Sequence, residues 1–159
     1  MTALSSVRSL TVADAEQMSA VHADAFASHD AWSPKTFRDL LAAETGRALG
    51  LFSESELKAL ILVQYVCREA EILTLATRRS DHRKGYARQV LDHLQARLQP
   101  MGLDRWLLDV AADNSAAIAF YRSRGFECDG RRADYYRRAN GQRVDSILMS
   151  KQMAGQGLG

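Results

Sequence analysis

Residues 70–94 read AEILTLATRRSDHRKGYARQVLDHL, and the spacing of the apolar residues changes within this stretch. Apolar residues fill most of 70–77, which predicts a strand that is covered on both faces. After a break over 78–84, apolar positions recur at helical spacing and predict a helix over 85–99. These positions are Tyr86, Val90, Leu91, Leu94 and Leu98. The stretch therefore predicts a strand, a turn and a helix in direct succession.

The turn between this strand and this helix is strongly basic. Its cationic residues are Arg78, Arg79, Arg83, Lys84 and Arg88. The first N–H groups of a helix lack intrahelical partners and lie at the positive end of the helix dipole, so they attract anions. Gly85 lets the backbone approach an anion closely, and Ala87 adds little bulk. The turn is neither a Gly-Lys-Ser/Thr phosphate loop nor a Gly-x-Gly-x-x-Gly fingerprint. It predicts an anion cradle, although a solvated basic helix start has the same composition.

The sequence on either side of this unit predicts the rest of the fold. Upstream, we expect a strand over 7–12, a helix over 15–27 capped by Asp14, a helix opened by Ser33-Pro34 and ended by Gly46, and strands over 47–53 and 57–67. Downstream, we expect a strand over 104–112, a helix capped by Asn114 or Ser115 and ended by Gly125, and strands over 126–131 and 143–151 joined at Asn140-Gly141. This order predicts an α/β (α+β) fold, with a mixed central sheet of about seven strands flanked by about four helices.

Length and composition limit the possible classes of protein. The 159 residues suit one domain, expected at 1–152, followed by a flexible tail at 153–159. The net charge of +2 is too small to indicate a nucleic-acid partner. The longest apolar run, at 59–63, is far too short to span a membrane, and the N-terminus lacks the pattern of a signal peptide. Cys67 and Cys128 form no CxxC pair, so we expect buried, inert thiols and a cytoplasmic protein without a metal site.

Three long stretches are similar to a known group of enzymes. They are 70–94, RWLLDVAADNSAAIAFYRSRGF at 105–126 and RRADYYRRANGQRVDSILM at 131–149, with WSPKTF at 32–37 as a shorter fourth. They resemble the GNAT superfamily of acetyltransferases and, within it, the RimI family, which acetylates the N-terminal alanine of a small-ribosomal-subunit protein. The resemblance covers most of 7–152. It implies the GNAT fold, acetyl-CoA as co-substrate and a protein N-terminus as acceptor, with no metal, membrane or direct nucleic-acid contact required.

The resemblance also implies which residues hold the cofactor. Leu75, Ala76 and Thr77 fall where a strand end pairs with the pantetheine arm of acetyl-CoA. The residues that match the pyrophosphate loop are Arg83, Lys84, Gly85, Tyr86, Ala87 and Arg88, and Asn114 matches a further cofactor contact. His82 stands where the family usually has Gln or Arg, and we expect this change to have little effect because backbone N–H groups do most of the holding.

The same comparison implies roles in the chemistry. Tyr121 falls where the family has a tyrosine that protonates the leaving thiolate, and Asp109 falls where it has a glutamate that accepts a proton. Because aspartate is one methylene shorter, Asp109 must act through a water or on a closer amine. Glu71, on the neighbouring strand, is a rival base. Three aromatic residues are expected at the acceptor groove: Trp32, Tyr135 and Tyr136.

An acetyl transfer of this kind needs a neutral amine, a donor for the oxyanion and a proton for the thiolate. An α-amine has an ordinary pKa of about 7.7–8.0, against about 10.4 for lysine, so a weak base suffices for an N-terminus. Two alternatives stay open: a small-molecule amine as acceptor, and a non-catalytic acyl-CoA-binding or ribosome-associated module. The residues His22, His29 and His93 are expected to take no part in catalysis.

Overall fold

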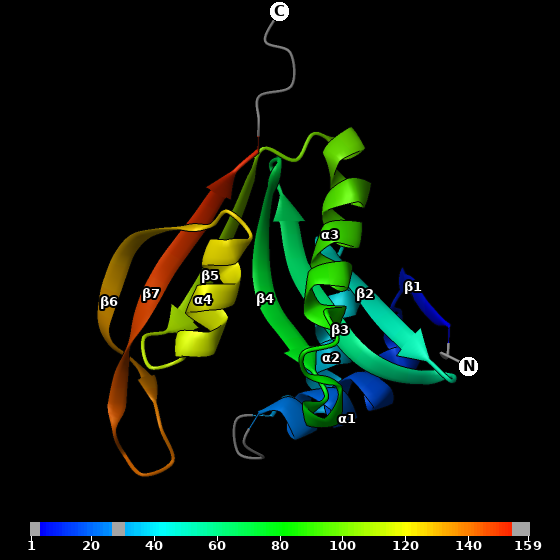
Figure 1. Cartoon of the computed structure of the whole chain (residues 1–159), viewed down its shortest axis with the longest axis horizontal. Coiled ribbons are helices and arrows are strands. Elements are labelled where there is room, and N and C mark those ends of the chain that lie inside the picture. The colour runs from blue at the N-terminus through cyan, green and yellow to red at the C-terminus, as the bar shows by residue number, and fades with distance from the viewer. Residues whose placement is uncertain (1–3, 27–30, 154–159) are drawn as a thin grey trace, which may run out of the picture.

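The computed structural model describes residues 4–26 and 31–153. Its elements in chain order are β1 (Ser5–Ser9), η1 (Val12–Asp14), α1 (Ala15–Ala25), α2 (Pro34–Ala42), β2 (Gly46–Ser53), β3 (Glu56–Val66), β4 (Glu69–Thr77), η3 (Arg79–Asp81), α3 (Tyr86–Leu98), η4 (Gln99–Met101), β5 (Arg105–Ala111), α4 (Ser115–Ser123), β6 (Glu127–Arg137) and β7 (Arg143–Gln152), where η marks a 3-10 turn. Figure 1 shows the strands forming one twisted sheet with helices on both faces.

The described strands form a mixed sheet of seven in the order β1-β2-β3-β4-β5-β7-β6. Neighbouring strands run antiparallel except β4 and β5, which are parallel. Those two pair only over Glu69–Ile72 and Arg105–Leu108, and they diverge beyond this point, as Figure 1 shows at their arrowheads. The expected mixed sheet flanked by helices is confirmed. The divergence of β4 and β5 opens the centre of the sheet at the C-terminal ends of both strands.

Two apolar cores hold the helices against the sheet. One core lies under α3 and α4, where Leu91 and Tyr121 pack against residues of the central strands. The other lies under α1 and α2 on the opposite face, around Met18 and Phe37. Trp106 of β5 is fully buried in the first core, and its indole N–H donates to Gln95 Oε1 at 3.2 Å. Each face of the sheet therefore has its own helix pair, and the splay between β4 and β5 connects the two faces.

The start of the chain differs from the expectation. The first strand is Ser5–Ser9 and not 7–12, and the next residues form the 3-10 turn η1. Asp14 does not cap α1 with its side chain. Its carboxylate accepts the Thr11 N–H at 2.8 Å and two hydrogen bonds of 3.0 Å from the Arg8 guanidinium, which holds the pKa of Asp14 below its usual value. Asp14 is the N-cap residue of α1 as expected, but its carboxylate closes the preceding turn and makes no capping hydrogen bond to the helix.

The second helix also ends earlier than expected. It stops at Ala42, and Gly46 is the first residue of β2. A side chain at position 46 would collide with the Leu40 carbonyl, so this glycine permits a close approach between the end of α2 and the sheet. Ser33 caps this helix as expected, accepting the Thr36 N–H at 3.2 Å.

The last strands and the cysteines give further corrections. Strand β6 runs Glu127–Arg137, well past the expected 126–131, because shifts in its register with β7 let an irregular, largely exposed edge strand continue. Cys67 and Cys128 are both exposed, contrary to the expected burial: Cys67 lies in the β3–β4 turn and Cys128 on β6. The Met153 N–H donates to Asp104 O at 2.8 Å, whereas the rest of the expected tail, 154–159, lies outside the described residues.

Candidate active site

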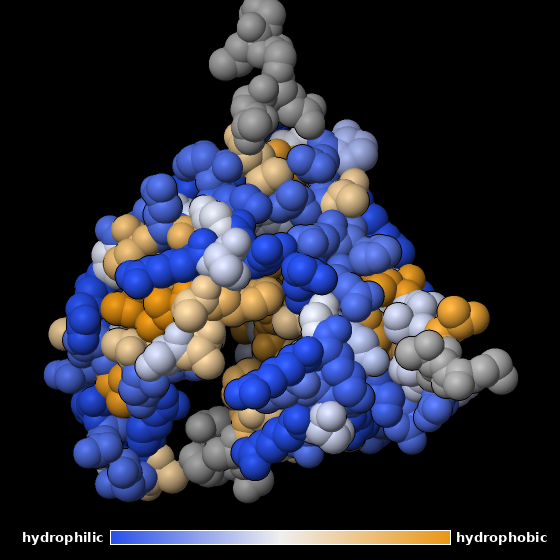
Figure 2. All heavy atoms as spheres, in the orientation of Figure 1, coloured by the Kyte–Doolittle hydropathy of each residue, from blue (hydrophilic) through white to orange (hydrophobic). Residues whose placement is uncertain are grey.

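A cavity of about 400 Å³ fills the splay between β4 and β5. Four regions line it: 72–75 of β4, 108–111 of β5, the start and centre of α4, and the α1–α2 side of the sheet with the end of β6. Figure 2 shows this face of the molecule hollowed at that position, with apolar side chains beside the opening. Because the cavity touches α4 on one face and α1 on the other, it leads through the sheet.

A β-bulge on β4 borders this cavity. Leu62 of β3 pairs with Thr74 and Val63 pairs with Ile72, so Leu73 is an extra residue without a partner in the ladder. A bulge bends its strand and leaves backbone groups of the extra residue out of the regular pairing. Leu73 lines the cavity. A backbone N–H at this place is a suitable donor for a negative oxygen that develops in the cavity.

Tyr121 enters the cavity from the α4 face. Its side chain is 7 % exposed, and its ring packs edge-on against Phe120 and Phe126 at centroid distances of 5.4 and 5.3 Å. Burial raises the pKa of Tyr121, so the hydroxyl keeps its proton at neutral pH. This hydroxyl has no hydrogen-bond partner among the described residues, and it is therefore available to a molecule in the cavity. Asn114, also in the lining, caps α4 by accepting the Ala117 N–H at 3.2 Å.

Asp109 approaches the cavity from the opposite face. Leu108 and Val110 are buried in the α3/α4 core, and because side chains alternate along a strand, Asp109 points to the other side. Asp109 is the one carboxylate among the described residues that line the cavity. Glu71 is exposed and does not line it. The geometry thus separates the two candidate bases and brings only Asp109 to the splay.

A second cavity, of about 390 Å³, adjoins the first behind Asp109. Both Asp109 and Glu71 line it, together with Arg132 and Tyr135. Tyr136 lines the first cavity, whereas Tyr135 is 50 % exposed, although the two rings meet edge-on at 5.1 Å. The two tyrosines that were expected to act together therefore face different cavities.

His22 lines the first cavity, a position that no pattern in the sequence indicates. Trp32, an expected site residue, lies next to it: the Trp32 N–H donates to His22 Nδ1 at 3.1 Å, and the two rings stack at 4.9 Å. Burial lowers the pKa of His22 to about 4, so the imidazole is neutral. His22 shares the buried face of α1 with Met18 and Val21, and its helical spacing is that of a core residue. Of the other histidines expected to take no part in catalysis, His29 lies outside the described residues.

We expect His22 to make folding sensitive to mild acid. Its pKa of about 4 in the folded protein lies below the ordinary 6.5, so the unfolded chain binds a proton first as the pH falls. The contribution of neutral His22 to the free energy of unfolding is fully present above pH 6.5 and is lost as the pH falls towards 4. Between pH 7 and pH 5 the free energy of unfolding should fall by about 1–2 kcal/mol because of His22. Urea unfolding at both pH values measures it. His22→Gln serves as control, and an equal loss in wild type and variant would contradict this origin.

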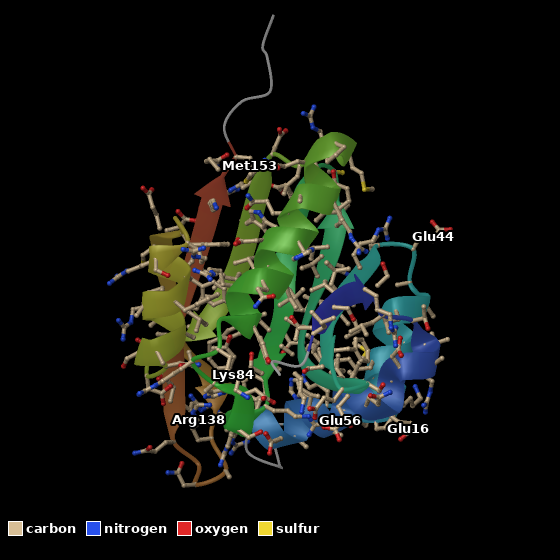
Figure 3. The ribbon with its side chains drawn as sticks, turned by 45° about the vertical axis from the view of Figure 1, so that its right-hand side comes forward. Glu16, Glu44, Glu56, Lys84, Arg138 and Met153 are labelled. Atoms are coloured by element: carbon tan, nitrogen blue, oxygen red, sulfur yellow. The ribbon has the colours of Figure 1, made fainter. Side chains whose placement is uncertain are left out.

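The basic turn before α3 has the backbone of an anion cradle. Arg83 and Gly85 both have left-handed φ angles, of 67° and 78°, and α3 begins at Tyr86, so successive N–H groups can point outward from the turn. Lys84 Nζ pairs with the buried Asp81 at 2.8 Å, which raises the pKa of Lys84. Figure 3 shows Lys84 at the start of α3. These features fit a pyrophosphate, and Arg83 and Arg88 supply charge that no ion pair within the described residues takes up.

Hydrogen bonds fasten the turn to its surroundings. The His82 ring nitrogen Nε2 lies 3.2 Å from the Thr77 carbonyl, and the Arg79 N–H donates to Asp24 of α1 at 2.7 Å. Of the three residues expected to hold the pantetheine arm, Leu75 lines the cavity, while the Ala76 side chain is buried in the α1/α2 core. Beyond Ile72 the β5 side of β4 is an unpaired strand edge, which is the kind of backbone that an extended amide chain can join.

Residues 12–126 match the Acetyltransferase (GNAT) family. The match includes β4, the bulge, the basic turn, β5 and Tyr121, which together form the splay and most of its lining. The molecule is therefore a GNAT acetyltransferase, and enzymes of this fold use acetyl-CoA as co-substrate. No described helix has the length and apolar character needed to cross a membrane, and the described residues contain no cluster of metal-binding side chains.

Proteins of similar sequence and structure place the chain more narrowly within the GNAT acetyltransferases. The chain is 35 % identical over 119 residues to the [ribosomal protein bS18]-alanine N-acetyltransferase of Salmonella typhimurium, covering 75 % of this chain and 79 % of that one. It is 31 % identical over 135 residues to the N-alpha-acetyltransferase RimI of Mycobacterium tuberculosis, covering 82 % and 84 %. The crystal structure of the ribosomal-protein-S18-alanine N-acetyltransferase from Escherichia coli superposes with a TM-score of 0.87 at 32 % identity, covering 98 % and 99 %. The chain belongs to the RimI family and is an acetyl-CoA-dependent N-acetyltransferase, which confirms the resemblance seen in the sequence.

Proposed function

We propose that this enzyme acetylates the N-terminal α-amine of a protein, such as a small-subunit ribosomal protein, in the cytoplasm, with 1–152 acting as one catalytic domain. The observation that carries the proposal is the cavity through the sheet, with Tyr121 on one side and Asp109 on the other. A thioester reaching Tyr121 and an amine reaching Asp109 meet there from opposite faces. The names of the relatives, which act on ribosomal protein bS18 or on an α-amine, support the same acceptor.

The charge of the cavity supports a peptide rather than a small polyamine. Arg137 and Arg138 line it, Arg138 in an ion pair with Asp113, and Asp109 is the one carboxylate among the described lining residues. A small polycation would meet these two guanidinium groups, which is unfavourable when charges approach within a few ångströms. The backbone of a peptide offers carbonyl oxygens to the same donors. Trp32 and Tyr136 then form the wall beside the first acceptor residue, and Tyr135 contacts chain that leaves over the second cavity.

For acetyl-CoA we propose a path from the β4 edge to the basic turn. The backbone at Leu75, Ala76 and Thr77 pairs with the amides of the pantetheine arm, and Asn114 contacts the cofactor on the α4 side. The pyrophosphate lies on the N–H groups between Arg83 and Arg88, that is, on Arg83, Lys84, Gly85, Tyr86, Ala87 and Arg88. The left-handed angles at Arg83 and Gly85 support this placement, because they turn consecutive N–H groups towards one anion.

The chemistry then follows from the positions of the side chains. The neutral amine attacks the thioester carbonyl and forms the C–N bond. The developing oxyanion accepts a hydrogen bond from the backbone N–H at the Leu73 bulge. As the C–S bond breaks, Tyr121 gives its proton to the thiolate sulfur. The proton that the amine loses goes to Asp109. Because aspartate has one methylene fewer than glutamate, its carboxylate lies further from the amine. Glu71 faces only the second cavity and has no direct part.

A peptide assay tests this proposal. One peptide carries a free α-amine at the N-terminus of the small-subunit ribosomal protein, and a second has that amine blocked but keeps its lysines. We expect acetyl transfer from acetyl-CoA to the first peptide only, measured by mass spectrometry. Transfer to the blocked peptide alone would contradict the α-amine specificity. Binding of acetyl-CoA without transfer to either peptide would instead indicate a non-catalytic acyl-CoA-binding module.

A further inference from the structure

A buried serine lies directly behind Asp109. Ser146 of β7 is fully buried, and its hydroxyl donates to Asp109 Oδ1 across 3.5 Å. Strand register explains the contact: Asp109 pairs with Leu148 and Ala111 pairs with Ser146, so Ser146 and Asp109 lie diagonally on the same face of the sheet. A hydroxyl that is excluded from water can hydrogen-bond only to the protein groups that it contacts, and Asp109 is one of them.

The Tyr136 side chain is the second neighbour of Ser146. Tyr136 pairs with Val144, two residues before Ser146 on β7, and its side chain is half-buried in the lining of the first cavity. Burial raises the pKa of Tyr136, while the nearby Ser146 side chain opposes this rise and the Asp109 charge adds to it. Ser146 therefore lies between the Tyr136 side chain, which faces the acceptor, and the Asp109 carboxylate, which lies further from it.

The length of the contact matters for what Ser146 can do. A distance of 3.5 Å exceeds the roughly 2.7–2.8 Å of a strong O–H···O hydrogen bond. A serine hydroxyl has one proton and two lone pairs, and it can rotate between neighbours. Ser146 can thus accept from Tyr136 while it donates to Asp109, and hydrogen bonds of this kind tighten when the substrate is in place.

We propose that Ser146 links Tyr136 to Asp109 in a proton relay that removes the proton from the acceptor ammonium group. The inference rests on the proposed N-acetylation and deepens it. The ammonium N–H bond breaks and its proton passes to the Tyr136 oxygen, the Tyr136 proton passes to Ser146 Oγ, and the Ser146 proton passes to Asp109 Oδ1. The amine is left neutral with its lone pair, Tyr136 and Ser146 are unchanged, and Asp109 is protonated. No oxidant or further reactant is required.

The second cavity completes the path. Asp109 lines both cavities, and the second one also borders Glu71 and Asp129, which are carboxylates in contact with water. Protonated Asp109 can therefore return its proton to solvent on the side away from the acceptor. The relay also gives an amine in the first cavity a route to the shorter aspartate, because the two hydroxyl groups lie between them.

Steady-state kinetics of Ser146→Ala test the relay. At pH 7 we expect kcat to fall about tenfold while KM for acetyl-CoA stays unchanged, because general base catalysis is lost and only about a tenth of an α-amine is neutral at this pH. At pH 9 the α-amine, with an ordinary pKa of about 7.7–8.0, is already neutral, so the variant should approach wild type to within about threefold. Ser146→Thr keeps the hydroxyl and should retain most of the activity at pH 7.

Ser150→Ala is the matched control. Ser150 is also buried, on the same face of β7, and lines neither cavity, so its removal should leave the pH profile unchanged. Full activity of Ser146→Ala at pH 7, or an equal deficit at pH 7 and 9, would overturn the relay. Thermal unfolding of each variant identifies a general loss of structure. If wild type acetylates only lysine, the proposed acceptor fails, yet the relay is still tested, because recovery then moves to the pH at which lysine becomes neutral.

Discussion

Gly85→Glu is expected to weaken acetyl-CoA binding by at least about 100-fold. Gly85 has a φ of 78°, where a side chain costs roughly 1–2 kcal/mol in the left-handed region. The larger effect is electrostatic: the new carboxylate would lie at the N-terminus of α3 and occupy the N–H groups that the pyrophosphate needs. Calorimetric titration with acetyl-CoA measures the change. A 100-fold loss represents roughly 2.7 kcal/mol of binding free energy.

Three control variants separate these contributions. Gly85→Ala introduces the backbone strain without the charge and should weaken binding by only about tenfold, in line with about 1–2 kcal/mol. Gly141→Glu adds the same carboxylate at another glycine of positive φ, in the open β6–β7 turn, and should leave acetyl-CoA binding intact. His82→Gln should change binding little. Normal binding by Gly85→Glu together with loss in His82→Gln would mean that the anion lies elsewhere on the turn.

Sequence reasoning predicted the centre of this molecule better than its borders. The strand, turn and helix of 70–99 are where they were expected, because apolar spacing there is regular and the break is marked by charge and glycine. The first strand was misplaced because Ser5–Ser9 is mostly exposed and has no apolar alternation to mark it. For the same reason the expected β6 was too short: all of its residues are exposed or half-buried.

Predicting the site required knowing how strands pair. That Asp109 and Tyr121 approach one cavity from opposite faces depends on the splay of β4 from β5, and no local pattern at Ile72 or Leu108 marks where their pairing ends. Choosing between Asp109 and Glu71 likewise required the sheet. Ser146 gave no signal, because a serine in a strand has no pattern of its own; its role depends on the register that places it beside Asp109.

Tyr121→Phe is expected to reduce kcat about 100- to 1,000-fold, within the usual effect of removing a general acid. Acetyl-CoA binding and thermal stability should change little, because the hydroxyl has no hydrogen-bond partner among the described residues and the ring keeps its contacts with Phe120 and Phe126. Tyr65→Phe is a matched control: its hydroxyl donates to Met101 O at 3.0 Å, away from either cavity, and its loss should leave kcat unchanged.

The pH dependence distinguishes the acid from the relay. Burial raises the pKa of Tyr121, so this hydroxyl stays protonated from pH 7 to pH 9 and the wild-type rate should show no loss from its ionisation in that range. Removing it deprives the thiolate of a proton, and raising the pH cannot replace that proton. The deficit of Tyr121→Phe should therefore persist at pH 9, where Ser146→Ala recovers. If Tyr121→Phe also recovered at pH 9, Tyr121 would be acting on the amine, and the two sides of the cavity would have to exchange roles.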